Sequence, residues 1–180
     1  MDIIEDIQYL DIKTLPNSFV CMCVARRRGG KTTLVEDMII KLREAKKLDM
    51  CFLFSGTDAG FPMIRGDKFR KTDIEDLKPI LNNYEVMNEY NKIADPPNKF
   101  KLKTLVVIDD LVLKLKNKNF SEILSNICVN GRHISYKPLS LSFIIIGQNL
   151  TSFPRVVRNN VDLCLFNNIS SQKELEYLLD

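Results

Sequence analysis

The stretch VARRRGGKTTL, at positions 24–34, contains the groups that a phosphate-binding site needs. Gly30 allows a tight turn, the ammonium group of Lys31 can neutralise terminal phosphates, and the hydroxyl group of Thr32 can hold Mg²⁺. The spacing matches GxxxxGK[ST] except at the first glycine, where Ala25 stands, and that position has the least direct contact with phosphate. A basic loop before an ordinary helix is the alternative, which glycines directly after an apolar run disfavour. The residues predicted to bind the nucleotide are Ala25, Arg26, Arg27, Arg28, Gly29, Gly30, Lys31, Thr32 and Thr33.

A second apolar run, 104–108, ends in two carboxylates, Asp109 and Asp110. At the carboxyl end of a strand beside a phosphate loop, Asp109 is predicted to hold Mg²⁺ together with Thr32. Asp110 is predicted to polarise the water that attacks the γ-phosphate, while Lys31 neutralises charge. Two acids could instead simply begin a turn, but the phosphate loop upstream favours the catalytic interpretation.

A polar amide, Gln148, follows a third apolar run at 141–146. The chain resembles the ATPase arrangement with an extra strand, which implies that this run lies between the strand before the phosphate loop and the strand before Asp109. Gln148 would then sense the γ-phosphate or orient the attacking water. The alternative is an amide that only begins a loop.

Short apolar runs alternate with helical patterns along the whole chain, which is typical of βαβ units around a parallel sheet. We expect strands at 19–24, 50–55, 104–108, 141–146 and 161–166. We expect helices at about 31–47, from about 73 onward, at about 120–129 and, as a short last helix, at 171–180. The sequence therefore predicts an α/β fold with five parallel strands and crossover helices.

Several residues mark expected helix boundaries. Thr72 and Glu75 have the spacing of a capping box, which predicts that a helix opens near position 73. Pro79 is expected to bend or split that helix. The pair Asn130 and Gly131 is expected to end the next helix, because both residues tolerate the left-handed conformation of a C-terminal cap.

Length and composition fit one compact domain. The chain has 180 residues, of which 45% are hydrophobic and 27% charged, and its net charge is +3. This mild basicity is compatible with a nucleic-acid partner without requiring one. The N-terminus is acidic, so we expect no signal peptide, and no apolar run has the length of a membrane span. The odd number of cysteines, 5, suggests buried reduced thiols in a cytosol-like compartment.

The phosphate loop, the acid pair and Gln148, in this order, resemble the FtsK–HerA superfamily of P-loop ATPases. Within it, the chain is most similar to the poxvirus-type genome-packaging ATPases of large DNA viruses. The segments NGRH at 130–133 and PRVVRNN at 154–160 support this resemblance, which extends from about 18 to 166. Ala25 departs from the family's glycine, and Asp110 stands where many members have Glu.

The resemblance implies a RecA/ASCE-like, three-layer α/β/α P-loop NTPase with a mostly parallel five-stranded sheet. Residues 1–180 would form a single P-loop ATPase domain with a core of about 18–167. The implied cofactors are ATP and Mg²⁺. The implied activity is an ATP-driven motor that moves double-stranded DNA into a preformed capsid. Its partners would be DNA, capsid or portal-site proteins and further copies of itself in a ring. The protein would be located at virus assembly sites in the host cytoplasm, or in the virion.

Arginines are the remaining candidates for a catalytic role. In a ring of this kind, an arginine of one subunit stabilises the transition state on its neighbour's γ-phosphate. Arg132 is the first candidate for this arginine finger and Arg158 the second, and a surface arginine in a salt bridge is the alternative for each. The side chains of Arg26 to Arg28 are expected to face solvent, a neighbouring subunit or DNA.

Two other functions fit the same loop. A small P-loop phosphotransferase, such as a nucleoside or nucleotide kinase, would have this size, but the acid pair suits water activation better than phosphorylation of a hydroxyl group. A nucleotide-binding assembly module without hydrolysis would not require Asp110. Nucleoside-dependent turnover would indicate the first, and an intact function of Asp110→Asn the second.

Overall fold

Six parallel strands form one sheet in the described part of the chain. The computed structural model describes residues 10–55, 61, 68–71, 76–109, 118–134 and 138–167, with backbone alone at 68–71, 118–120 and 130–134. The strands are β1 (Val20–Ala25), β2 (Met50–Ser55), β3 (Lys68–Lys71), β4 (Lys103–Asp109), β5 (Ser140–Gly147) and β6 (Leu163–Asn167). Their order is β3-β2-β4-β5-β1-β6, and every neighbouring pair is parallel.

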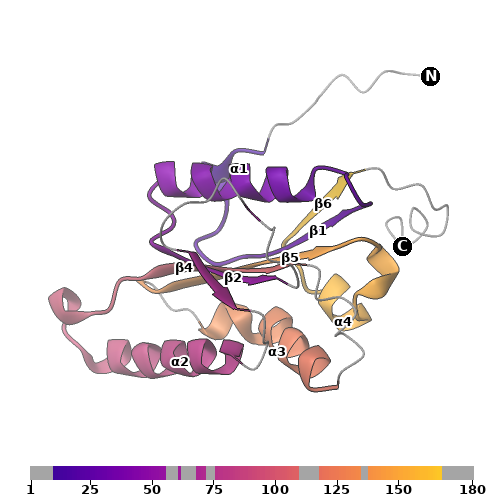
Figure 1. Cartoon of the computed structure of the whole chain (residues 1–180). Helices are drawn as coiled ribbons and strands as arrows, with labels where there is room; N and C mark the ends of the chain where they lie inside the picture. Colours follow the sequence, from indigo (N-terminus) through magenta and orange to yellow (C-terminus); the bar gives the residue numbers. More distant parts are fainter. Residues whose placement is uncertain are drawn as a thin grey trace, which may run out of the picture.

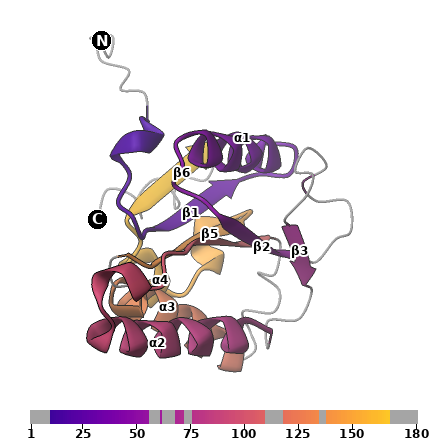
Figure 2. The ribbon, with the colours of Figure 1, turned by 90° about the vertical axis from the view of Figure 1, so that its left-hand side faces the viewer.

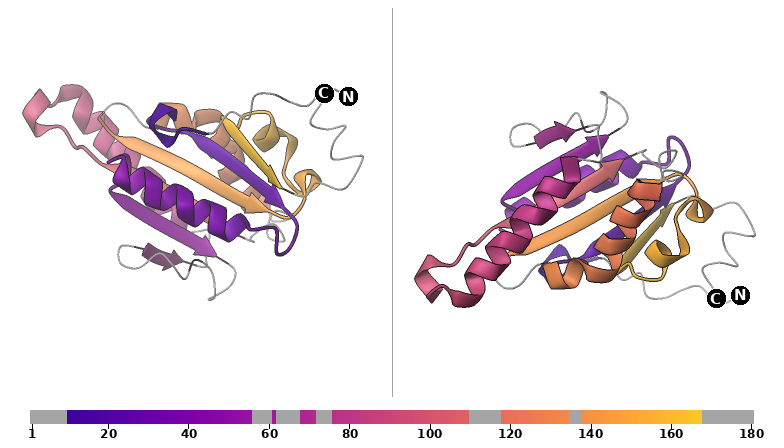
Figure 3. Two further views of the ribbon diagram at one scale, coloured as in Figure 1. Left: turned by 90° about the horizontal axis from the view of Figure 1, so that it is seen from above. Right: turned by 90° about the horizontal axis from the view of Figure 1, so that it is seen from below.

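The helices cover both faces of the sheet. They are α1 (Lys31–Glu44), α2 (Leu77–Ile93), α3 (Lys118–Ile134) and the short α4 (Arg155–Arg158), with 3-10 turns η1 (Ile12–Thr14), η3 (Pro96–Asn98) and η5 (Leu150–Ser152). Helix α1 and the turn η1 lie on one face, whereas α2 and α3 lie on the other (Figures 1 and 2). The views from above and below show the two faces separately (Figure 3). The result is the predicted three-layer arrangement.

The central strands are buried on both faces, which explains their composition. All residues of β1 and β5 are buried. Successive side chains of a strand point to opposite faces, so such a strand reads as a continuous apolar run rather than an alternating one. In β1, Met22 packs in the core beneath α2 and α3, whereas Cys21 and Cys23 pack in the core beneath α1.

The predicted strands are all present, with an addition at one edge of the sheet. The strands expected at 19–24, 50–55, 104–108, 141–146 and 161–166 appear within about two residues of those bounds. Strand β3 was not predicted. Its sequence, KFRK, has no apolar run because it is a four-residue edge strand that pairs with β2 alone.

Two predicted helix boundaries are wrong. Helix α3 continues through Asn130 and Gly131 to Ile134. A glycine inside a helix costs only about 1 kcal/mol, which the burial of Leu124 and Ile127 offsets. Helix α2 is not split at Pro79, because this residue is the third of the helix, where backbone amides have no intrahelical acceptor in any case.

The expectations for the first helix, the cysteines, the capping pair and the last helix have different outcomes. The first helix ends at Glu44, before the expected 47. Four cysteines are buried as expected, but Cys164 is exposed on the edge strand β6. The capping pair Thr72 and Glu75 and the helix expected at 171–180 lie outside the described residues. In the part that is described, no helix is long and apolar enough to span a membrane.

Candidate nucleotide-binding site

The connection between β1 and α1 is a tight loop whose shape depends on two glycines. The amide of Gly29 donates to the carbonyl oxygen of Arg26 at 3.0 Å. A Cβ atom on Gly29 would lie 2.9 Å from that oxygen and 3.0 Å from the Cβ of Ala25, so no larger residue fits. Gly30 has φ +72°, a left-handed conformation that glycine adopts without steric cost.

The first turn of α1 presents free amide groups at the end of this loop. The first intrahelical bond of the turn runs from the amide of Leu34 to the carbonyl of Gly30 at 2.9 Å. No acceptor among the described residues faces the amides of Lys31, Thr32 and Thr33. These amides and the positive end of the helix dipole favour a bound anion, and phosphate groups have the required charge and acceptors.

The side chain of Lys31 lies back across the loop. Its Nζ donates to the carbonyl oxygens of Ala25 at 2.6 Å and Arg26 at 2.8 Å. The ammonium group is therefore held at the start of the loop, where it adds positive charge to this region. An incoming phosphate oxygen would replace these carbonyls as its acceptor.

Asp109 ends β4 at the same edge of the sheet. It is half-buried and in register with Ser55 of β2 and Ile146 of β5. The charges of Asp109 and Lys31 both act on Cys23 of β1, the former raising and the latter lowering its pKa, while burial dominates and raises that pKa to about 11. The carboxylate and the ammonium group are thus both close enough to Cys23 for their charges to act on it.

Gln148 lies between the loop and Asp109, as the sequence predicts. Strand β5 separates β1 from β4 in the sheet, and its last residue, Gly147, is in register with Val24. Gln148 follows immediately and is half-buried. The described parts of the three sequence motifs therefore meet at one edge of the sheet, although 123 residues separate Ala25 from Gln148 along the chain.

The predicted metal ligands Thr32 and Asp109 are both half-buried and belong to this edge. A hydroxyl oxygen and a carboxylate oxygen are the kind of hard ligand that Mg²⁺ prefers and usually shares with substrate phosphates. In the described part of the chain, no group of three or more His, Cys, Asp or Glu residues could hold a metal by itself. The oxygen atoms of Thr32 and Asp109 fit Mg²⁺ that shares its coordination with a nucleotide.

The three arginines of the loop are exposed, in agreement with the expectation that they face outward. None of their guanidinium groups forms an ion pair with a described residue. Arg28 has φ 62°, a left-handed conformation that a residue with a side chain rarely adopts. Their charge adds to that of Lys31 at the mouth of the loop.

The remaining candidates lie elsewhere. Asp110 is outside the described residues. Arg132 belongs to the last turn of α3, shortly before β5 begins at Ser140, so its backbone lies toward the amino ends of the strands. Burial raises the pKa of Cys128 in the same helix, and the charge of Asp162, the residue before β6, raises it further, which places this part of α3 near the amino end of β6. The sheet is about 20 Å deep, so the backbone of Arg132 is remote from the loop.

Arg158, the second candidate for the arginine finger, has a different position. It is the last residue of α4, where it is half-buried, and α4 packs against α3. The neighbouring Val157 is fully buried in the core on the α2 and α3 side of the sheet.

The sequence reasoning missed one contact at the loop. The side-chain amide of Asn167, the last residue of β6, donates to the carbonyl oxygen of Gly29 at 2.9 Å. These residues are 138 positions apart. No local pattern marks such a pair, and only the pairing of β6 with β1 brings them together.

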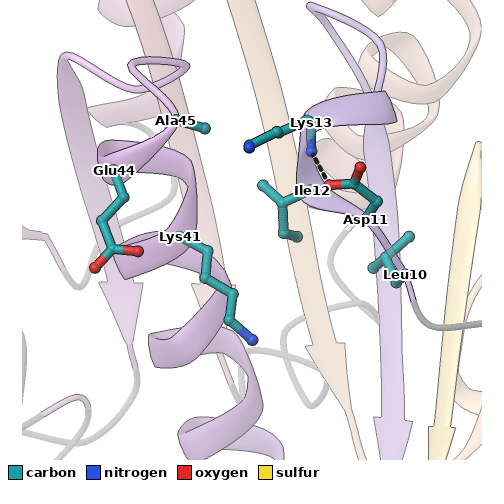
Figure 4. Close-up of a pocket in the computed structure, with 7 residues that line it drawn as sticks. All are labelled: Leu10, Asp11, Ile12, Lys13, Lys41, Glu44 and Ala45. Atoms are coloured by element: carbon teal, nitrogen blue, oxygen red, sulfur yellow. Dashed lines mark hydrogen bonds between the residues drawn. The ribbon is translucent and has the colours of Figure 1, made fainter.

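Two hollows on the described surface lie away from the loop. One, of about 450 Å³, is enclosed by η1 and the carboxyl end of α1, at the other end of that helix from Lys31 (Figure 4). Another, of about 370 Å³, is lined by residues of α2 and of the segment after it, namely Asn88, Asn91, Lys92 and Lys99. Neither contains a residue predicted to bind the nucleotide.

Comparisons with known proteins identify the fold. No family model matches the chain, and no curated protein matches it. Among solved structures, the cytoplasmic domain of EssC has a TM-score of 0.64 at 15% identity, with 91% of this chain and 35% of that chain covered. The chain thus spans about a third of that structure.

Structures of a viral protein also match. The genome packaging NTPase B204 from Sulfolobus turreted icosahedral virus 2, in complex with sulfate, has a TM-score of 0.61 at 13% identity. The match covers 92% of this chain and 81% of that one. The complex of the same protein with ATP-gammaS has a TM-score of 0.55 at 16% identity, with 92% and 82% covered. The resemblance to genome-packaging ATPases is therefore confirmed at the level of the fold, and the chain has the α/β fold of a P-loop NTPase.

Proposed function

We propose that this protein binds ATP with Mg²⁺ at the loop between β1 and α1 and hydrolyses it to move double-stranded DNA into a viral capsid. One observation carries the proposal: the free amides of α1, Lys31, Asp109 and Gln148 meet at one edge of a sheet whose fold matches that of a genome packaging NTPase. An anion site alone would support binding, and a carboxylate and an amide beside it add the groups that hydrolysis needs.

Each residue of this edge has a distinct role in the proposed reaction. The amides of α1 and the ammonium group of Lys31 bind the phosphates and neutralise the charge that develops on them. Thr32 and Asp109 would hold Mg²⁺, which neutralises phosphate charge when it is bound. Gln148 orients the attacking water, and Asp110 accepts its proton.

The transition state also requires a positive charge opposite the loop. Because Arg132 lies toward the amino ends of the strands, it would act on the nucleotide of a neighbouring subunit. We therefore propose that residues 1–180 form a single ATPase domain, which assembles as a ring and works with capsid or portal-site proteins at virus assembly sites. Arg158 is the second candidate for the same role.

Phosphate release with and without duplex DNA tests the proposal. Duplex DNA is expected to stimulate ATP turnover by the full chain, and Lys31→Ala should abolish binding and hydrolysis. Asp110→Asn should bind ATP but not turn it over. Normal hydrolysis by Lys31→Ala would overturn the assignment of the site.

Two other outcomes would point to different functions. Turnover that requires a nucleoside rather than DNA would indicate a phosphotransferase. Nucleotide binding without turnover, unchanged by Asp110→Asn, would indicate an assembly module.

A further inference from the structure

The carbonyl oxygen of Gly29 is held by a residue that no sequence motif includes. Asn167 donates its side-chain Nδ2–H to this oxygen at 2.9 Å. Asn167 is in register with Ala25, where β1 leads into the loop, so the strand pairing places the amide beside the loop. We infer that Asn167 is a positioning residue that orients the phosphate loop for nucleotides with a β-phosphate; the inference rests on the proposed function.

The planarity of the peptide bond connects this contact to phosphate binding. In a trans peptide, the C=O of one residue and the N–H of the next point in opposite directions. The hydrogen bond keeps the Gly29 carbonyl turned toward β6. The amide of Gly30 is therefore turned away from β6, toward the side of the loop where the amides of α1 are free.

This peptide has few other restraints. It joins two glycines, and a Cβ on Gly30 would meet nothing within 4 Å, so no packing limits its rotation on that side. Within the described residues, no second donor reaches the Gly29 carbonyl. A glycine–glycine peptide otherwise turns over easily, because both residues populate left- and right-handed conformations. Asn167 thus sets which way the Gly30 amide points.

The role of Asn167 predicts a selective effect on ligands. A loop of this kind cradles the α- and β-phosphates with its backbone amides, and we assign the β-phosphate to the Gly30 amide and the α-phosphate to the amides of α1. Loss of the contact with the Gly30 amide should weaken the binding of ADP and ATP, which carry a β-phosphate. It should weaken the binding of AMP, which has no β-phosphate, much less. A contact that merely attaches β6 to the loop would change thermal stability and would affect the three nucleotides alike.

Calorimetric titration of the full chain with ADP, ATPγS and AMP, in the presence of Mg²⁺, tests this inference. The variants are Asn167→Ala and Asn167→Leu, the latter of similar size but without a donor. Asn98→Ala is the control, because Asn98 is an exposed asparagine of η3, before the amino end of β4. Both Asn167 variants should weaken ADP and ATPγS binding about three- to tenfold, as expected for one hydrogen bond, and AMP binding less than twofold.

The outcomes separate this inference from the proposed function. Wild-type affinity for ADP in either Asn167 variant, or an equal loss for ADP and AMP, would overturn it while leaving the nucleotide site in place. A wild-type chain that does not bind ADP would overturn both. Circular dichroism melting of each variant checks that the fold is retained.

Discussion

At the scale of single residues, Ala25 and Gly29 share one small space. Strand β1 ends in an alanine where the phosphate-loop pattern has glycine, and its methyl group is buried. A Cβ on Gly29 would lie 3.0 Å from this methyl carbon. The side-chain volume that Ala25 adds is thus accommodated because residue 29 has none, which explains why the departure from the pattern leaves a formed loop.

Gly29→Ala is therefore expected to lose ATP affinity by more than tenfold, since the new Cβ would lie 2.9 Å from the carbonyl oxygen of Arg26 and must displace the loop. Titration with a fluorescent ATP analogue measures this loss. Ala25→Gly is the matched control and should bind nearly as the wild type does. The double variant should recover little, because the contact with the Arg26 carbonyl persists. Unchanged binding by Gly29→Ala would contradict this account.

Arg28 gives a second prediction at this scale. Its left-handed backbone, φ 62°, costs a residue with a side chain about 1–2 kcal/mol. Arg28→Gly should remove this strain at an entropic cost of about 0.5–1 kcal/mol, so the free energy of unfolding should rise by up to about 1.5 kcal/mol. Arg27→Gly, at a position without positive φ, should instead lower stability. Urea unfolding of both variants checks the difference in sign.

At the scale of elements, a lysine joins the turn η1 to the end of α1. The Nζ of Lys47 donates to the carbonyl oxygens of Lys13 at 2.6 Å and Leu15 at 2.7 Å. Ile12 and Leu15 pack in the core beneath α1, so this contact fixes the segment that closes that core on one side. A cation is favourable here also because the helix dipole is negative at its carboxyl end.

Lys47→Met keeps the aliphatic stem and removes both donors. It should lower the free energy of unfolding by about 1–2 kcal/mol, because two carbonyl groups lose a partner. Lys46→Met is the control: Lys46 is exposed, and the change leaves in place its backbone carbonyl, which accepts from Lys103 Nζ. It should change stability by less than about 0.5 kcal/mol. Equal effects of the two variants in chemical denaturation would contradict this role of Lys47.

Sequence patterns predicted the elements better than their ends. Buried strands such as β1 and β5 are visible as apolar runs, because both faces are covered. The end of α3 was not visible, because burial of its apolar face outweighs the low helix propensity of Asn130 and Gly131. Strand β3 carries mainly charged residues, and its pairing with β2 depends on contacts that are distant in the sequence.

In the candidate site, too, some features could be predicted from the sequence and others could not. Gly30, Lys31, Asp109 and Gln148 could be placed together from the sequence, since the carboxyl ends of parallel strands share one edge. The contact of Asn167 with the loop could not, because it depends on the register of β6 against β1 rather than on a local motif.

At the scale of the whole molecule, the position of Arg132 makes the proposed assembly of subunits into a ring testable. Its helix turn lies at the edge of the sheet opposite the phosphate loop, so the proposed ring would bring the two groups to one nucleotide from two subunits. Subunits with Lys31→Ala and subunits with Arg132→Ala should each be inactive alone. A mixture should recover part of the ATPase activity, because some interfaces then join an intact loop to an intact arginine.

This complementation separates the possible roles of Arg132. An arginine that served its own subunit would give no recovery, since neither variant holds both groups. Full activity of Arg132→Ala alone would exclude Arg132 as the finger. The same mixture with Arg158→Ala then tests the second candidate, and a mass measurement of the mixed sample confirms that the subunits assemble.

The position of β5 between β1 and β4 also sets the distance between the ends of those two strands. Neighbouring strands lie about 4.8 Å apart, so the ends of β1 and β4 are separated by roughly 10 Å. Under the proposed function, the bound triphosphate and its Mg²⁺ would span this distance between Lys31 and Asp109. The sheet thus fixes the spacing between Lys31 and Asp109, and Gln148 lies between them. In the proposed reaction, cleavage of the bond to the γ-phosphate would remove this connection. The contacts at the ends of both strands would then change together.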